Sequence, residues 1–586
     1  MSLDSDGKNF WEIKTFDGLT GGLNFADRSE NLEDSESPNI LNLFYRKDEV
    51  LVDTGYSEFL GVVRGIPRAE IQFFLTDGSD ISCLVTNDTF YVKIGTQWQY
   101  PAGGDGTATT MAVAGVATNT TIKVVDDTGF GDGDFIAIEL DDGTQHQTTI
   151  NGAPAANVIT LDDALPSSSA IGKYVCRAPV FAGDDGEQIS FVAAPSVNWL
   201  VFTNGIDVLQ RFDGTSVEPV PGTPSSGNTV CKAVALYKNF LFLINTNEGG
   251  TYRPQRARWS ALADFITWPA NNFVDMVDTE DQAICAYPLG PYLIIYKTVT
   301  IVRVSFLGLA TKTFNFDNVI STEGVNSVQS VVVLEKEHIF FGQGGVFGYK
   351  GGMEVTELGE KVWEMLFGTD SELNPSFANR VIGMYIHDLN EVWFHYPDVN
   401  SEYPNNTLRY IVSEKVWLKR RFHNTISGYG FFAITTTRTW NDLIGDWTEQ
   451  DWIWGSSKVS ASSPTVLLLN DENLQVYEYN FLSGDDNGTV IDFEMETKEF
   501  YHPENKMRFD SFMMEMKGTA VDFAYSTDRG NTWNTIADGY ALQATYELYN
   551  MGYQFVADRI RFRFSGSGSG FGIRWFAFKW RPESVH

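Results

Sequence analysis

Residues 71–95, IQFFLTDGSDISCLVTNDTFYVKIG, are short apolar or alternating runs broken by turns. The dipeptides Asp77-Gly78 and Asn87-Asp88 favour tight turns, and β-branched and aromatic residues fill the runs between them. The stretch NWLVFTNGIDVLQRFDGTSVEPV at 198–220 repeats the pattern. Such runs are typical of antiparallel hairpins, so we expect a chain built largely from hairpins.

The composition also favours an all-β protein. Aromatic residues make up 14% of the 586 residues, and there are 53 glycines. Aromatic side chains suit pleated, half-buried surfaces, and glycines suit the turns between strands. Helical periodicity is confined to two short stretches, 360–368 and 260–265. The length predicts two to four domains.

Several turn-and-strand segments resemble one another along the chain. They are TNDTFYVKIGTQWQY from 86, TNGIDVLQRFDGTSVEPV from 203, GQGGVFGYKGGMEVTEL from 342 and NDENLQVYEYN from 470. With the hairpins between them, they predict about six or seven hairpin-rich units at uneven spacing. Antiparallel blades arranged radially leave only short, protected edges, so this pattern favours an irregular β-propeller.

The predicted propeller is interrupted once and then followed by a different module. Residues 101–178 carry 10 acids and 3 bases in a Gly-rich frame, which indicates a small inserted β-domain. Residues 490–586 hold long alternating strands, which predict a C-terminal β-sandwich. We therefore expect an N-terminal arm and the first propeller hairpins at 1–100, and the propeller body at 179–489.

The charge of the chain limits its partners. Asp and Glu number 76 against 42 Lys and Arg, a net charge of -34. Proteins that grip nucleic acid or anionic membranes use cations, so both kinds of binding are disfavoured. No apolar run approaches the roughly 18 residues of a membrane span, so we expect no direct membrane insertion. The acidity serves either solubility or a surface that repels DNA, and composition does not separate the two.

One short motif suggests sugar chemistry. YSTDRGNTW at 525–533 is an Asp-box, with Ser526, Asp528, Gly530 and Trp533 at its key positions, and sialidases carry such boxes on successive propeller blades. This chain has one copy, and it lies in the predicted sandwich. The Asp and Gly close a tight turn while the Trp packs beneath it. We therefore predict a structural role for these four residues and no catalytic residue among them.

No metal, cofactor or nucleophile pattern stands out. GFGDGDF at 129–135 and ELDDG at 139–143 resemble loose calcium loops, but neither has the alternating acids and distal Glu of a specific site. His387 and His395 flank Glu391 without the H-E-x-x-H spacing. Phosphate-binding and nucleophile-elbow motifs are missing as well. We expect no metal, no cofactor and no enzymatic activity, although calcium binding by the acidic turns stays open.

The chain has one basic cluster, in KVWLKRR at 415–421. Cations interleaved with aromatic residues suit a nucleic acid or an acidic partner. On a protein this acidic they are better explained by carboxylate partners within the chain or across a subunit boundary. We favour a subunit or partner contact, made by Lys415, Lys419, Arg420 and Arg421.

Several segments in one order resemble a known family. Near the start, Gly21-Gly22-Leu23-Asn24 is followed by Pro38-Asn39 and then Asn42. Further on come RARWSALADFITW (256–268), LIIYKTVTIVRV (293–304) and TEGVNSVQSVVVLEKEHIFFGQGGVFGYKGGMEVTELGEKV (322–362). These phrases resemble the tail nozzle, or tail tubular protein B, family of short-tailed phages, also described as packaged-DNA stabilisation proteins. The 101–178 insert resembles a small β-module of phage tail and fibre proteins.

The resemblance implies a structural virion protein with a propeller. Family members form a ring, commonly a homohexamer, below the tail adaptor ring, and such a ring contacts tail fibres or a spike. It would retain packaged double-stranded DNA and then conduct it during ejection without binding it tightly. The location implied is the virion tail, assembled in the host cytoplasm. A polysaccharide-degrading or receptor-binding tail protein built on a β-propeller is the alternative.

Overall fold

The computed structural model describes residues 11–583 apart from residues 18–19, 47–48, 185, 310–311, 370, 434–463, 481–482 and 503–505. In these residues nearly all regular structure is β-strand. The helix predicted at 360–368 is present as a 3-10 turn, Glu360–Val362, and α1, Trp363–Phe367. Residues 260–265 instead form a turn between strands. None of the described helices is long and apolar enough to cross a membrane.

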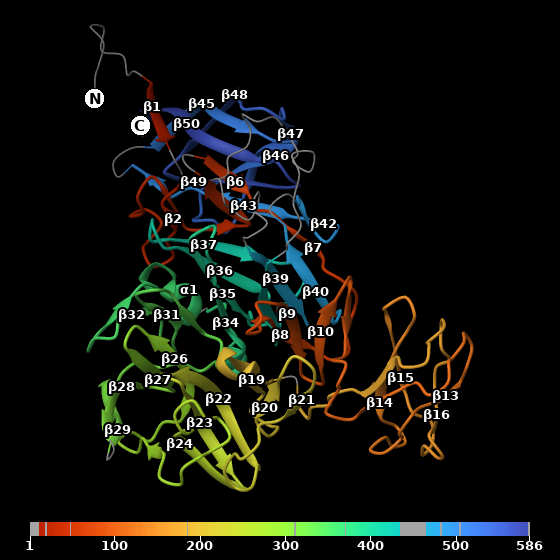
Figure 1. Cartoon of the computed structure of the whole chain (residues 1–586). Helices are drawn as coiled ribbons and strands as arrows, with labels where there is room; N and C mark the ends of the chain where they lie inside the picture. Colours follow the sequence, from red (N-terminus) through yellow and green to blue (C-terminus); the bar gives the residue numbers. More distant parts are fainter. Residues whose placement is uncertain are drawn as a thin grey trace, which may run out of the picture.

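Five four-stranded antiparallel sheets follow one another, each in chain order (Figure 1). They are β18–β21 (Ser190–Ala194, Trp199–Thr203, Gln210–Phe212, Val217–Pro219), β22–β25 (Thr229–Tyr237, Phe240–Glu248, Thr251–Trp259, Phe273–Asp275), β26–β29 (Ala283–Leu289, Tyr292–Lys297, Ile301–Leu309, Lys312–Ile320), β30–β33 (Val331–Val333, His338–Phe341, Val346–Tyr349, Val355–Glu357) and β34–β37 (Ile382–Ile386, Glu391–Tyr396, Asn406–Ile411, Val416–Arg421). Each sheet is one blade of a β-propeller. The irregular propeller predicted from the hairpin repeat is thereby confirmed.

Two further blades form one larger sheet. The first is β8–β11 (Pro67–Phe74, Asp80–Thr86, Phe90–Ile94, Gln97–Gln99), and the second contains β38 (Gly428–Ala433), β39 (Pro464–Asn470) and β40 (Gln475–Tyr479). The innermost strands β8 and β38 lie parallel, with Tyr429 opposite Ala69. The fourth strand of the second blade is β7, Tyr56–Glu58, from the N-terminal part of the chain. The described residues therefore form seven blades, and β7 closes the ring.

The predicted insert is a separate module beside the propeller (Figure 1). Its strands form a four-stranded and a two-stranded sheet, and they are β12–β17 (Ala108–Thr110, Thr121–Lys123, Phe135–Glu139, Gln145–Thr149, Val158–Thr160, Tyr174–Arg177). A small core of its own fills the module. The side chain of Arg64 stacks on the ring of Phe135 at 3.3 Å, and Gln145 accepts a hydrogen bond from the backbone of Tyr100. These contacts hold the insert against the first blade.

The C-terminal strands form the predicted β-sandwich, but four N-terminal strands complete it. The C-terminal strands are β43–β50 (Asp492–Glu496, Phe500–Tyr501, Lys506–Lys517, Ala520–Ser526, Asn534–Ala541, Glu547–Ala557, Arg559–Ser567, Gly572–Glu583). β1 (Glu12–Asp17) and β6 (Glu49–Val52) pair with β50, β5 (Leu43–Arg46) pairs with β6, and β4 (Ile40–Leu41) pairs with β43. The expected division at 490 is therefore incomplete, because the N-terminal strands β1, β4, β5 and β6 belong to the sandwich.

The polypeptide passes between sandwich and propeller at a tightly packed junction. Gly22, in β2 (Gly22–Leu23), has φ of +80°, and a Cβ there would lie 2.2 Å from Val416 Cγ1. The side chain of Asn42 donates to the backbone oxygen of Asp492 in the sandwich and accepts from the backbone N–H of Arg421 in the propeller, at 2.6 and 2.7 Å. One asparagine thus joins the two modules directly.

A buried ion network lies behind this junction. Arg409 in β36 donates to both carboxylate oxygens of Glu391 at 2.8 and 3.1 Å and also donates to Asp53. Arg420 in β37 donates to Asp486 at 2.6 Å, and its Nε lies 3.5 Å from Asp53. Asp53 directly precedes the segment that forms β7, and Asp486 lies in β41, Asp485–Asp486, which pairs with β7. The network therefore anchors the strand that closes the propeller.

The pKa values show how these charges are held. Burial opposes ionisation of Asp53, but Arg409 and Arg420 outweigh it and lower its pKa. Burial raises the pKa of Asp486 to about 6, because Arg420 offsets only part of the desolvation. Asp53 is thus the carboxylate that both arginines share, while Glu391 and Asp486 each pair with one of them.

Replacement of Asp53 by Ala should destabilise the whole chain. Two guanidinium groups would remain buried without their shared carboxylate, and breaking a buried pair costs roughly 3–5 kcal/mol. Urea unfolding monitored by tryptophan fluorescence measures this loss. Asp278→Ala is the control, since Asp278 is exposed. Equal unfolding free energies for the two variants would contradict the anchoring role.

A second buried carboxyl lies where the first and last blades meet. Glu70 in β8 accepts a hydrogen bond from Ser82 Oγ at 2.6 Å, and its other oxygen has no partner among the described residues. A Cβ at residue 430 in β38 would lie 2.4 Å from that oxygen, so Gly430 is the residue that leaves room for it. Burial raises the pKa of Glu70 to about 8 from 4.5.

This shift predicts a pH dependence of stability. A raised folded-state pKa contributes stability that is fully present below pH 4.5 and is lost as pH rises through about 8. Glu70→Gln removes the titration, so the wild type should lose on the order of 3 kcal/mol relative to the variant between pH 4.5 and pH 7. Denaturant titrations at several pH values measure this difference. A constant difference across the range would contradict the assignment.

Candidate functional site

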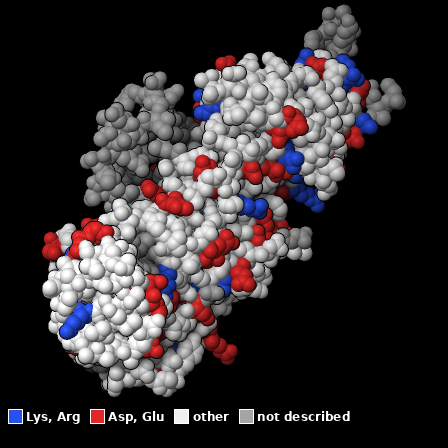
Figure 2. All heavy atoms as spheres, turned by 90° about the vertical axis from the view of Figure 1, so that its right-hand side faces the viewer, with Lys and Arg blue, Asp and Glu red and all other residues white. Residues whose placement is uncertain are grey.

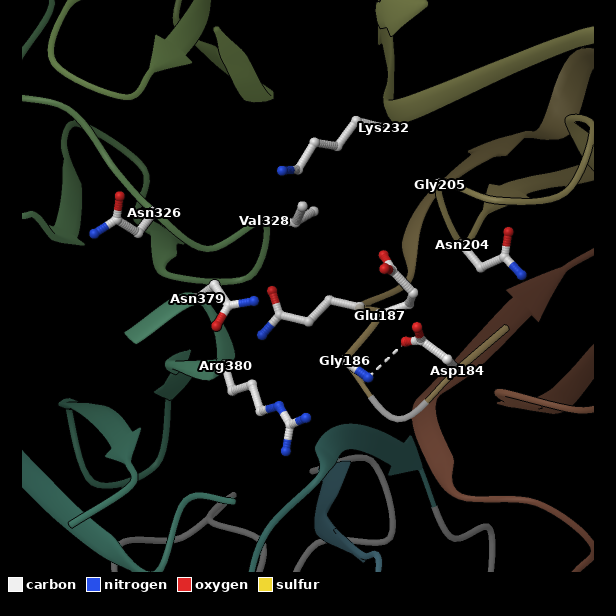
Figure 3. Close-up of a pocket in the computed structure, with 11 residues that line it drawn as sticks. Asp184, Gly186, Glu187, Asn204, Gly205, Lys232, Asn326, Val328, Asn379 and Arg380 are labelled. Atoms are coloured by element: carbon white, nitrogen blue, oxygen red, sulfur yellow. Dashed lines mark hydrogen bonds between the residues drawn. The ribbon is translucent and has the colours of Figure 1, made fainter. Parts of the chain in front are cut away.

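The blades surround a polar cavity of 520 Å³ near the propeller axis (Figure 3). Its walls come from the start of four blades, those that begin with β18, β22, β30 and β34, and from the turn between β19 and β20. Its lining residues are Asp184, Gly186, Glu187, Gln188, Asn204, Gly205, Lys232, Asn326, Val328, Asn379 and Arg380. A cavity of this volume has the size of a small-molecule site.

Two charged side chains approach the cavity from different blades. Lys232 lies in β22, and its ammonium group points into the cavity, as does the carboxylate of Glu187 just before β18 (Figure 3). Burial lowers the pKa of Lys232, and Glu187 opposes this shift. Burial and the neighbouring Asp184 raise the pKa of Glu187, although Lys232 acts in the other direction. Both groups are partly removed from water.

Other wall residues are fixed by the scaffold. Gln188 accepts from Ser327 Oγ at 2.7 Å and donates to the backbone oxygen of Val381 at 3.2 Å, so it ties two blades together. Arg380 stacks on Phe377 and Tyr403 with its guanidinium carbon 4.7 and 4.4 Å from the ring centres. These contacts hold the walls in place before any ligand arrives.

The chemical repertoire of the cavity is narrow. Its described lining has two carboxylates, one arginine and no tyrosine, so it does not reproduce the arginine cluster and tyrosine nucleophile of a sialidase. No aromatic ring lines it either, which leaves hydrogen bonds and charge as the means of recognition. Among the described residues, no group of three or more His, Cys, Asp or Glu side chains could hold a metal ion. The cavity is best suited to a small polar molecule.

Sequence reasoning did not select the cavity residues. Glu187 and Lys232 are single polar residues near the start of apolar strands, with no motif around them. Alignment of the blades by their innermost strands would have supplied the signal, because residues near the start of these strands meet at the axis. The hairpin repeat aligns the blades by their turns, and these turns lie between the outer strands of each blade.

The basic cluster does not form one surface. Lys419 is 6% exposed and donates to Glu372 at 2.6 and 2.7 Å, and Arg420 is 1% exposed within the buried network. The prediction of a subunit contact is wrong for these two residues, because their carboxylate partners belong to the same chain. Lys415 and Arg421 are exposed. A partner contact through them stays a prediction.

The Asp-box forms the turn between β46 and β47. Asp528 accepts from the backbone N–H and the hydroxyl of Thr532 at 2.8 and 2.6 Å, and Ser526 Oγ accepts from the backbone of Gly530 at 2.8 Å. Gly530 has φ of +92°. The ring of Trp533 packs under the guanidinium of Arg563 at 4.4 Å. These bonds give all four Asp-box residues the structural role predicted for them.

The other acidic motifs are local turns as well. Asp134 accepts a hydrogen bond from the backbone N–H of Gly131 at 2.7 Å, and Asp142 accepts one from the backbone N–H of Thr144 at 2.9 Å. Glu391 lies in the buried network, and His395 is buried beside Thr407, 2.7 Å from its hydroxyl. Burial lowers the pKa of His395 to about 3, so it stays neutral. The two motif regions therefore serve packing and turn formation.

Comparison with known proteins leaves the family of the chain open. No family model and no curated protein matches it. A calcium-binding protein, regucalcin, from Agrobacterium tumefaciens is 7% identical over 50% of this chain and 88% of that chain, with a TM-score of 0.29. An exo-β-1,3-galactanase from Phanerochaete chrysosporium is 7% identical over 60% of this chain and 99% of that chain, with a TM-score of 0.23. Raptor from Chaetomium thermophilum is 7% identical over 73% of this chain and 30% of that chain, with a TM-score of 0.24.

Replacement of Asp528 by Ala should weaken the sandwich slightly. Hydrogen bonds from Thr532 and Ser526 lower the pKa of Asp528 to about 2, so its contribution is present above the ordinary Asp pKa of 3.8 and is lost as pH falls through 2. Thermal unfolding at neutral pH should show a lower midpoint than in the wild type. Asp538→Ala, at an exposed position in the neighbouring strand, is the control. An unchanged unfolding midpoint in Asp528→Ala would argue against a structural role for the Asp-box turn.

Proposed function

We propose that the chain is a structural virion protein that forms the distal tail nozzle ring of a short-tailed phage. In this proposal, copies assemble into a homohexamer below the adaptor ring, beside fibres or a spike. The ring retains packaged DNA and conducts it during ejection, and the chain itself catalyses no reaction. The virion tail, assembled in the host cytoplasm, is the corresponding location.

The main support is the position of the residues that carry the family resemblance. Gly22 and Asn42 occupy the junction between sandwich and propeller, and both have positive φ. Asn39 donates to Glu494 in the sandwich at 2.5 Å, and Asn24 donates to Glu36 at 3.1 Å beside the same junction. The motif thus fixes how two modules are joined. A defined relation between rigid modules suits a protein whose role is assembly.

The later segments of the resemblance specify blade turns. Gly324 lies against the previous blade, since a Cβ there would be 2.2 Å from the backbone oxygen of Lys297. Tyr349 donates to the oxygen of Gly352 at 3.0 Å, and Arg303 donates to the oxygen of Gly351 at 2.9 Å. None of these residues lines the axial cavity. Within the same 322–362 segment, Asn326 and Val328 do line that cavity, so the resemblance covers the scaffold together with part of the cavity wall.

Charge is the second line of support. Acidic side chains are spread from the sandwich to the lower blades on the flank that carries the insert, with fewer basic ones between them (Figure 2). A conduit must not bind its cargo, and carboxylates repel phosphates while lysines and arginines would hold them. The axial cavity has the volume of a small-molecule site, so DNA would pass between copies of the chain.

A polysaccharide-degrading or receptor-binding tail protein is the second candidate. The observation that favours it is the axial cavity, where Asp184 and Glu187 provide two carboxylates in different environments. Glycosidases use such a pair as acid and as base or nucleophile. In this case the axial cavity would be the functional site, and ring assembly would not be required.

Images of the purified full-length chain by negative-stain electron microscopy test the proposal. Six-fold rings with an open centre are expected, either alone or with the adaptor ring. The rings should also bind linear duplex DNA only weakly at physiological salt, because the phosphates meet a predominantly acidic surface.

Other outcomes would reject the nozzle. Monomers or trimers in the presence of the adaptor, or tight duplex binding at physiological salt, contradict it. Release of reducing ends from a bacterial surface polysaccharide, abolished by Glu187→Gln but not by Glu323→Gln, would establish the second candidate instead. Glu323 does not line the cavity, so its replacement controls for loss of a carboxylate elsewhere on the propeller.

A further inference from the structure

The axial cavity holds a cation, Lys232, that has no direct partner in the described part of the chain. None of the described residues forms a hydrogen bond or an ion pair with its ammonium group, although the side chain is half-buried. Burial lowers the pKa of this lysine, and the neighbouring Glu187 opposes that shift. Glu187 is a counter-charge in the same cavity but forms no ion pair with Lys232, and a partly desolvated ammonium without a direct partner is unfavourable. An anionic group in the cavity would relieve this cost.

The opposite wall offers the complementary chemistry. The carboxylate of Glu187 accepts no hydrogen bond from a described residue and faces the same space (Figure 3). The amide of Asn379 points inward as well and has no described partner (Figure 3). Both are groups that bind hydroxyls. A ligand that fills the cavity therefore needs an anionic end and hydroxyl donors at the other end.

The charge and composition of the cavity walls restrict the class of ligand further. Lys232 and Arg380 balance Asp184 and Glu187, so the lining has no net charge to attract a polyanion. Without an aromatic ring in the walls, an aryl or strongly apolar ligand would have little to pack against. The volume of 520 Å³ admits one or two sugar rings.

We propose that the axial cavity binds a sugar acid, a monosaccharide or disaccharide that carries a carboxylate. The carboxylate accepts hydrogen bonds from Lys232, and the hydroxyls donate to Glu187 and meet the amide of Asn379. This site is a property of one subunit. It does not depend on ring assembly, and it requires no reaction.

Isothermal titration of the full chain with glucuronate tests the site, with glucose as the neutral analogue of the same ring. Glucuronate should bind saturably at millimolar or lower concentration, and glucose should bind more weakly. Lys232→Met should weaken glucuronate binding by about tenfold or more, because one charge-assisted contact is lost. Lys336→Met is the matched control, since Lys336 is an exposed lysine in the same propeller and should bind as the wild type does.

Asn379→Ala provides a second variant that folding does not confound, because Asn379 is exposed. It should weaken glucuronate and glucose binding alike, whereas Lys232→Met should affect glucuronate more. Absence of glucuronate binding to the wild type would overturn the proposal, as would equal affinity for the two sugars or wild-type affinity in Lys232→Met. Ring images of the same preparation report separately on the nozzle, so either idea can fail without the other.

Discussion

The buried charge of Arg409 and Arg420 is the constraint on which the architecture depends. Two guanidinium groups inside a protein require carboxylates close by, and neither can give up its charge. The carboxylates come from distant parts of the sequence, since Asp53 precedes the ring-closing strand and Asp486 follows the last blade. The ion network can form only when the N-terminal segment, the sixth blade and the return to the sandwich are all in place. It therefore links closure of the propeller to attachment of the sandwich.

Local sequence patterns predict those strands and turns that are formed by residues close together in the sequence. The hairpins of 71–95 and 198–220 are turns flanked by β-formers, and residues close in sequence decide them. The same holds for the insert and for the Asp-box turn, where Asp528 bonds to Thr532 only four residues away. The sequence predicts the type of each module because most strands of a module are neighbours in the sequence.

Pairing between strands that are far apart in the sequence could not be predicted from local patterns. β1 pairs with β50 at the other end of the chain, and β7 offers only three residues with no distinctive pattern. Within KVWLKRR, in contrast, the period of two residues along a strand places Arg420 on the face opposite to Lys419 and Arg421, so the sequence pattern already separates Arg420 from the other two. The cavity residues carry no local motif either, because the walls come from separate blades, and only an alignment of the innermost strands would have indicated them.

The propeller axis and the proposed ring axis make different physical demands. The ring axis must be wide and repellent, because the passing polymer gains nothing from contacts that slow it. The propeller axis is narrow and lined by groups of both signs, and such a surface binds small polar molecules. In the proposed ring, one subunit would meet both demands by keeping the ring axis separate from its propeller axis. Strand β7 completes the last described blade around that cavity, and the sandwich and the insert lie outside the propeller (Figure 1).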